Sequence, residues 1–176
     1  LLDGARLGTA LSADINDLTL KHIAELTDIF WIGGTKAGAL IGEAIVIPNQ
    51  QLAEDFSFHI KQRGALLAKG RLLGLQFSKL FENDLFFKLT QYSNVMAQKL
   101  SNAITAAGHS LAAQTESNQI FPILPNVMIE ALQEKFDFYN WEKVDEQLSV
   151  IRLVTSWATE EEQVDAFIEL INEMST

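Results

Sequence analysis

The sequence predicts an α/β fold, in which helices alternate with short apolar strands. Apolar residues recur at helical spacing over residues 18–26. The β-rich run at 29–32 follows, and residues 43–47 form a second short apolar run. Pro48 ends that run because proline removes a donor from the strand ladder. This alternation is typical of a sheet covered by helices.

Residues 51–81 predict a largely helical run that three glycines interrupt. Gly64, Gly70 and Gly74 lie within it. Glycine in a helix costs stability unless close packing or a bend compensates. We interpret these glycines as places of close packing.

Residues 84–107 predict one long amphipathic helix that ends at Gly108. Its apolar stripe is expected to be core and not a cofactor-binding surface. The stripe consists of Leu85, Leu89, Tyr92, Met96, Leu100 and Ile104.

The last third of the chain predicts two strands and two helices. Residues 119–124 form a strand whose proline places it at an edge or a bulge. Asn126 is expected to cap a helix over 127–136, and Thr159, followed by three glutamates, to cap the last helix. We interpret this acidic run as part of a helix start and not as a metal site. The buried stripe of the last helix is Val164, Phe167, Ile168 and Ile171.

Composition narrows the class of protein. The chain has 176 residues, of which 48% are hydrophobic and 20% charged, as in globular domains. A net charge of −10 argues against nucleic acid and anionic membranes as partners. The absence of cysteine excludes a disulfide framework and a thiolate metal site, and no other metal site is predicted. With no signal peptide and no apolar run near 18 residues, the expected location is the cytoplasm.

Lys36 is the first candidate for chemistry, because it follows an apolar run and lies among glycines. A lysine shielded at the end of a buried strand has a lowered pKa, and its neutral amine can form a Schiff base with a carbonyl. The alternative is a turn whose lysine points into water. Thr35, directly before it, has either a ligand-binding hydroxyl or a role in shaping the turn.

Asp3 is the second candidate, since it places a carboxylate at the end of another apolar run. An aspartate there can pair with the protonated pyridine nitrogen of pyridoxal phosphate (PLP) and keep the ring able to accept electrons. The alternative is that Asp3 begins a tight turn with Gly4 and pairs with Arg6 on the surface.

Arg152 lies inside the otherwise apolar run 149–155. An unpaired guanidinium is costly there, so we expect it to face an anion or a cleft. A substrate carboxylate fits this guanidinium, because arginine presents parallel donors to two carboxylate oxygens. The alternative is a structural pair with a nearby glutamate or aspartate.

Four segments together resemble the low-specificity L-threonine aldolases, which belong to the β-eliminating lyase group of fold-type-I PLP enzymes. The similarity runs in the family's order along essentially the whole chain. It implies that the chain starts in mid-domain and corresponds to the C-terminal half of the family's fold. The segments are Asp3-Gly-Ala-Arg-Leu-Gly and residues 27–39, 61–71 and 151–159.

The resemblance implies two domains. Residues 1–82 are expected to complete the large PLP-binding domain, with a mostly parallel sheet and helices, and residues 83–176 to form a smaller α+β C-terminal domain. The family's N-terminal arm and the histidine that stacks on the cofactor are expected before Leu1. The three histidines of this chain match no family site: His22, His59 and His109.

The resemblance also implies roles for the candidate residues. Lys36 binds PLP and is the catalytic residue, Asp3 holds the pyridine nitrogen, and Thr35 lies near the phosphate. Arg6 is expected near the substrate carboxylate or the ring hydroxyl, and Arg152 at the substrate carboxylate. The general base is expected in the preceding half or from water.

The resemblance also implies that three basic residues bind the cofactor phosphate of a neighbouring subunit. In the resembling enzymes this region lies by the subunit interface and sends basic side chains toward the neighbour's cofactor phosphate. Lys61, Arg63 and Lys69 are the candidates here, within a homo-oligomer that is a dimer or tetramer. The alternative is a solvated basic face.

The implied activity is cleavage of L-threonine or L-allo-threonine to glycine and an aldehyde. One alternative is another PLP-dependent β-eliminating lyase. A second alternative is that this chain alone is an inactive fragment that associates with itself or with the preceding segment, because half a sheet leaves an edge and an apolar face uncovered.

Overall fold

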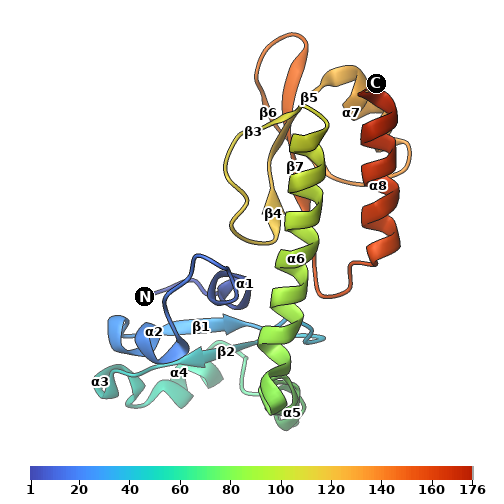
Figure 1. Ribbon diagram of the computed structural model, residues 1–176. Helices are drawn as coiled ribbons and strands as arrows, with labels where there is room; N and C mark the ends of the chain where they lie inside the picture. The colour runs from blue at the N-terminus through green and yellow to red at the C-terminus, as the bar shows by residue number, and fades with distance from the viewer. Residues whose placement is uncertain (176) are drawn as a thin grey trace. The chain divides into compact units, whose positions relative to one another are not determined.

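The computed structural model describes residues 1–175, which fall into two compact units (Figure 1). Unit 1 is Leu1–Thr90 and unit 2 is Gln91–Thr176. The division lies within the long helix α6 (Leu85–Ala106). The domain boundary predicted near residue 82 precedes this helix and stays a prediction. None of the helices in the described part of the chain combines the length and apolar character that a bilayer crossing needs.

Unit 1 contains a small sheet of two antiparallel strands. β1 (Phe30–Gly33) pairs with β2 (Glu43–Val46). The link between them is too short for a crossover, which takes about a dozen residues or more, so the strands return antiparallel. Parallel pairing in the described residues is limited to a bridge from Leu2 to Phe30. The mixed α/β class is confirmed, but the sheet itself is mostly antiparallel.

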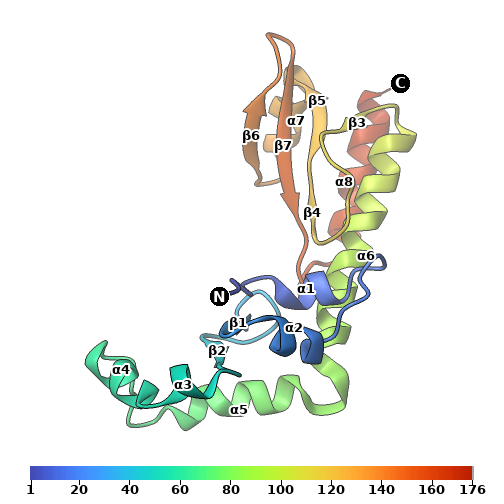
Figure 2. The same cartoon turned by 90° about the vertical axis from the view of Figure 1, so that its left-hand side faces the viewer.

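Helices pack against one another and against this sheet in unit 1, and α3, α4 and α5 follow in succession along the chain (Figure 2). The core joins Phe30 and Ile32 of β1 to Leu7, Ile23, Leu80 and Phe86. The helices are α1 (Leu7–Leu11), α2 (Leu20–Leu26), α3 (Gln50–Ala53), α4 (Phe56–Gln62) and α5 (Arg71–Leu80), with a 3-10 turn at Glu82–Asp84.

Close packing at two of the three interrupting glycines is a wrong prediction for this chain. A Cβ built on Gly64 or Gly74 meets no atom within 4 Å. Gly64 has a φ of +71°, so a left-handed backbone explains it. Gly74 lies on the exposed side of α5. Gly70 does approach a neighbour, since a Cβ built on it would lie 3.2 Å from the Leu67 carbonyl oxygen.

Unit 2 is built on an antiparallel sheet around β7 (Leu148–Val154). β4 (Gln119–Ile120) and β5 (Pro122–Pro125) pair with one edge of β7 in a continuous register. They are one strand, interrupted where Pro122 has no N–H to donate, as the sequence predicts. The remaining strands are β3 (Ser110–Leu111), which pairs with β5, and β6 (Tyr139–Lys143), which pairs with β7.

Three helices cover one face of this sheet (Figures 1 and 2). They are α6, α7 (Asn126–Gln133) and α8 (Glu161–Met174). Side chains alternate along β7, so Ile151 and Leu153 enter this core while Arg152 points to the opposite face. The predicted stripes are confirmed in part: Met96, Leu100, Ile104, Val164, Phe167 and Ile171 are buried, and Tyr92 and Ile168 pack against them half-buried. At the start of α6 the buried side chain is Phe86, whereas Leu85 and Leu89 of the predicted stripe are half-buried.

Two predicted helix caps are wrong. The N-cap of α7 is Pro125, and Asn126 is its first residue. The Asn126 side chain instead donates to the Glu146 carbonyl and accepts from the Ser149 hydroxyl. The N-cap of α8 is Glu160, without a side-chain hydrogen bond. Thr159 Oγ1 accepts from the Ser156 amide, so it closes the turn before the helix.

Candidate active site

Lys36 lies in a tight turn directly after β1. The Ala37 and Ala39 amides both donate to the Gly34 carbonyl at 2.9 Å. Both alanine side chains are buried, which fixes the turn to the core. Thr35 and Lys36 are exposed. The predicted position after a buried strand is confirmed, whereas the shielding expected for Lys36 is not provided by the described residues of this chain.

The Asp3 segment lies beside the strand that leads to Lys36. The Leu2 amide donates to the Ile29 carbonyl at 3.0 Å, and the Gly33 amide donates to the Gly4 carbonyl at 2.9 Å. The segment runs parallel to β1. The turns that carry Asp3 and Lys36 therefore follow two adjacent, parallel segments and lie at the same end of them.

Two glycines make this approach possible. A Cβ on Gly4 would lie 1.6 Å from the Trp31 carbonyl oxygen, and one on Gly33 would lie 2.5 Å from the Ala5 carbonyl oxygen. Contacts below 3.0 Å are not tolerated by real Cβ atoms. Gly4 and Gly33 thus allow the segment that carries Asp3 to lie directly against the strand that leads to Lys36.

Asp3 and Arg6 share one turn at the start of α1. Asp3 is exposed, and its Oδ1 accepts from the Ala5 amide at 2.9 Å. This is the tight turn that the sequence offers as an alternative to cofactor binding. Arg6 is half-buried at the N-cap of α1, and its carbonyl accepts from the Thr9 hydroxyl.

The basic candidates Lys61, Arg63 and Lys69 lie on and after α4. Lys61 is in the last turn of α4, Arg63 is its C-cap, and Lys69 is in the turn before α5. All three side chains are exposed. The structure does not bring them into the turns that carry Asp3 and Lys36.

Arg152 lies on the central strand of unit 2, half-buried, opposite Tyr139 of β6. Its Nε is buried and has no hydrogen-bond partner among the described residues. None of the ion pairs in residues 1–175 includes Arg152. The predicted alternative, a structural pair with an acidic residue, is therefore not seen in the described part of the chain.

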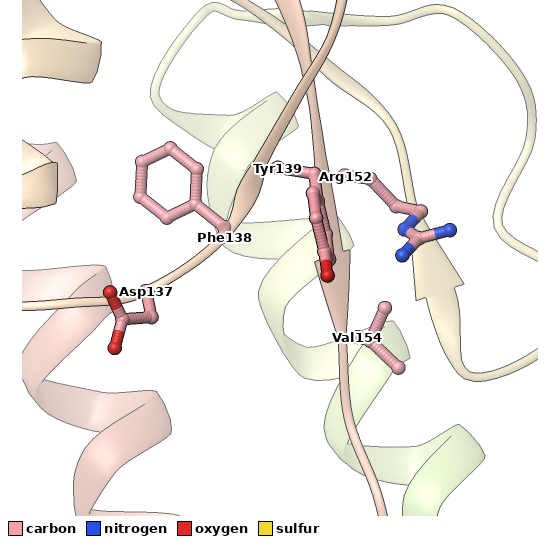
Figure 3. Close-up of a pocket in the computed structure, with 5 residues that line it drawn as sticks. All are labelled: Asp137, Phe138, Tyr139, Arg152 and Val154. Carbon is pink, nitrogen blue, oxygen red and sulfur yellow. The ribbon is translucent and has the colours of Figure 1, made fainter.

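Arg152 faces a cleft, as predicted. A pocket of about 370 Å³ lies here, and Figure 3 shows its lining side chains. The lining combines aromatic and aliphatic side chains with the Asp137 carboxylate and the half-buried Arg152 guanidinium, whose positive charge suits an anionic group of a small organic molecule. The lining residues are Asp137, Phe138, Tyr139, Arg152 and Val154.

The sequence reasoning missed the neighbours of Arg152. The Arg152 Cζ is 4.8 Å from the ring centroid of Tyr139 and 5.1 Å from that of Trp141. Every residue of β6 is exposed, so the strand lacks the alternation of apolar and polar residues that marks half-buried strands. Trp141 lies at a β-bulge between Asn140 and Glu142, where regular alternation breaks down, so the spacing of Tyr139 and Trp141 does not by itself predict that both rings reach Arg152.

The chain is similar to threonine aldolases over nearly its whole length. No protein-family model matches it. Two curated low-specificity L-threonine aldolases, from Pseudomonas sp. strain NCIMB 10558 and Pseudomonas aeruginosa, are 34% and 33% identical over 168 residues. Each match covers 93% of this chain and 46% of the relative. The chain thus spans about half the length of the curated relatives it matches.

Solved structures also show the similarity to threonine aldolases. A threonine aldolase from Leishmania major superposes with a TM-score of 0.96 at 50% identity, over 99% of this chain and 51% of that one. A serine palmitoyltransferase from Sphingomonas wittichii superposes with a TM-score of 0.62 at 13% identity, over 97% of this chain and 45% of that one, and shows the shared fold alone. The resemblance predicted from the motifs is confirmed: the chain is a relative of the threonine aldolases, with the fold-type-I architecture, over about half the length of those enzymes.

Proposed function

We propose that this chain is the C-terminal half of a PLP-dependent threonine aldolase and supplies its cofactor lysine. The parent enzyme cleaves L-threonine and L-allo-threonine to glycine and an aldehyde. The observation that carries the proposal is the adjacency of the Asp3 and Lys36 turns, held by the hydrogen bond from the Gly33 amide to the Gly4 carbonyl, in a chain 50% identical to a threonine aldolase.

The residues present fit PLP. An exposed primary amine and an exposed carboxylate follow adjacent parallel segments, which is the donor set that a pyridoxal aldehyde and its ring nitrogen require. PLP, when bound, would act as the acceptor of the electron pair released at the substrate α-carbon. Lys36 would hold the aldehyde carbon, Asp3 the ring nitrogen, and Thr35 and Arg6 the phosphate side and the ring hydroxyl or substrate carboxylate.

Arg152 is proposed to bind the α-carboxylate of the substrate. Its guanidinium has no acidic partner among the described residues and faces a pocket. An anion with two oxygens satisfies such a group better than water does, since both hydrogen bonds are charge-assisted. Fixing the carboxylate orients the bond that is to be broken.

Cleavage breaks the bond between Cα and Cβ. The β-hydroxyl loses its proton, its oxygen becomes the carbonyl of the aldehyde, and the remaining α-carbon is protonated to give glycine. The described residues offer no group that we assign as the base for the hydroxyl proton. In this scheme the chain binds and orients the substrate.

Lys61, Arg63 and Lys69 are proposed to reach the cofactor phosphate of a second subunit in a homo-oligomer. Their exposure and positive charge suit a phosphate. Large apolar side chains nearby are also exposed, which supports an interface at this part of unit 1. These are Phe58 at 68%, Leu66 at 57%, Leu72 at 67% and Leu75 at 55% exposure.

The domain limits 1–82 and 83–176 and a cytoplasmic location are part of the same proposal, and they stay predictions. The acidic net charge of −10 supports the absence of nucleic acid and membrane partners.

Product analysis with L-threonine tests the activity. An aldolase yields acetaldehyde and glycine, whereas another β-eliminating lyase yields 2-oxobutanoate and ammonia. The assay uses the purified chain with PLP, and again with the preceding half of a related threonine aldolase. Acetaldehyde only in the second case supports an aldolase half that is inactive alone, and 2-oxobutanoate contradicts the proposal.

A further inference from the structure

Two aromatic rings border the Arg152 guanidinium. Its Cζ lies 4.8 Å from the Tyr139 ring centroid and 5.1 Å from the Trp141 ring centroid. Both rings come from β6, and Tyr139 is the direct partner of Arg152 across the β6–β7 ladder. Figure 3 shows the Tyr139 and Arg152 side chains next to each other on these neighbouring strands. At these distances the ring faces attract the cation.

The rings hold the cation without occupying its donors. An aromatic face offers electrostatic attraction, whereas each guanidinium N–H still seeks an acceptor. The buried Nε has none among the described residues. The cation is therefore oriented, and its hydrogen-bonding capacity remains available for an anion.

Core packing does not account for the two rings. Tyr139 is 67% exposed and Trp141 is 54% exposed, and neither belongs to the core of unit 2. Trp141 is in turn steadied by an edge contact with Phe121, whose ring centroid is 5.4 Å away. The aromatic pair lies on the face of the sheet that carries Arg152.

We propose that Tyr139 and Trp141 are positioning residues that hold the Arg152 guanidinium in the orientation that receives the substrate carboxylate. The inference rests on the proposed role of Arg152. An arginine without such neighbours samples many rotamers, and ordering it on binding reduces affinity. The two rings order the side chain before the carboxylate arrives.

The test compares ring-removing with ring-keeping variants. Tyr139→Leu and Trp141→Leu remove one ring each, while Tyr139→Phe and Trp141→Phe keep a ring in place. Trp157→Leu is the matched control, since Trp157 is 41% exposed and makes no ring contact with Arg152 among the described residues. Far-UV circular dichroism verifies that each variant is folded.

The readout is the Nε–Hε signal of Arg152 in nitrogen-15 NMR spectra of the full chain. The chain has four arginines, so the signals are few, and Arg152→Lys assigns the one of interest. Sodium acetate, as the carboxylate probe, is titrated against sodium chloride at constant ionic strength. Affinity and ring-current shift are read from the same signal.

We expect the ring-current shift to persist in the Phe variants and to diminish in the Leu variants. Loss of one ring weakens acetate binding about threefold and loss of both about tenfold, from the usual strength of cation–π contacts. Acetate affinity unchanged in the double Leu variant overturns the inference, and so does an equal loss in Trp157→Leu or an Arg152 signal that ignores acetate. The assay needs neither PLP nor turnover, so its failure is distinct from a failure to cleave threonine.

Discussion

Because Gly4 lies so close to β1, replacing it with alanine should lower the free energy of unfolding of unit 1 by a large and measurable amount. A Cβ at Gly4 would lie 1.6 Å from the Trp31 carbonyl oxygen and 2.8 Å from the carbonyl carbon. These are backbone atoms of a buried strand, which cannot rotate away as a side chain can. In Gly4→Ala the segment that carries Asp3 must therefore move off β1.

The cost follows from what that movement breaks. Two backbone hydrogen bonds hold the segment to β1, from Leu2 to Ile29 at 3.0 Å and from Gly33 to Gly4 at 2.9 Å. At about 1 kcal/mol each, with about 1–3 kcal/mol for overpacking, the free energy of unfolding of unit 1 falls by about 3–5 kcal/mol. This is a large fraction of the stability of a typical domain.

Urea unfolding followed by fluorine NMR of 5-fluorotryptophan measures the effect in unit 1 alone. Trp31 reports on unit 1, and Trp141 and Trp157 report on unit 2. Gly74→Ala is the matched control, because a Cβ there meets no atom within 4 Å. Alanine inside helix α5 should stabilise unit 1 by about 0.5–1 kcal/mol. A Gly4→Ala chain whose Trp31 signal unfolds at the wild-type urea concentration, with the same slope, refutes the reasoning.

Two further predictions concern a loop and a hairpin. Gln76 accepts from the Leu40 and Ile41 amides and donates to the Ile41 carbonyl, so Gln76→Leu should speed hydrogen exchange of those amides about fivefold or more, and unchanged exchange contradicts this. Hydrogen bonds from the Gln147 amide and then the Leu148 amide hold the pKa of Asp145 below its ordinary value of 3.8. The stability that this carboxylate contributes is present above that value and is lost as the pH falls through its lowered pKa. Asp145→Asn should thus lower the free energy of unfolding of unit 2, measured in urea, more at about pH 5 than at about pH 2. An equal loss at both pH values contradicts the prediction.

Periodic patterns made the helical core of unit 2 predictable. The stripes through Met96 and Leu100 in α6 and through Val164 and Phe167 in α8 are buried, because apolar spacing alone decides which face of a long helix packs. The caps were less predictable. Asn126 and Thr159 are common capping residues, but the Asn126 side chain accepts a long-range hydrogen bond from Ser149 of β7, and Thr159 accepts a local one from the Ser156 amide of the preceding turn.

Local sequence located the candidate site but not its surroundings. Gly-Gly-Thr-Lys after an apolar run was sufficient to place Lys36 at the end of β1, and the structure confirms that position. Exposure of Lys36 depends on which segments cover the turn, and sequence spacing does not contain that information. The pairing of Arg152 with Tyr139 is a contact between strands, so it follows from register and not from any local pattern.

The cofactor lysine is the central claim, and chemical trapping tests it most directly. The purified chain is mixed with PLP, reduced with borohydride and digested, and the modified peptide is located by mass spectrometry, with Lys36→Ala as the control. We expect one predominant adduct, on Lys36, that is absent from the Lys36→Ala chain. Adducts spread evenly over surface lysines such as Lys21, Lys79 and Lys88, or no adduct at all, would contradict it.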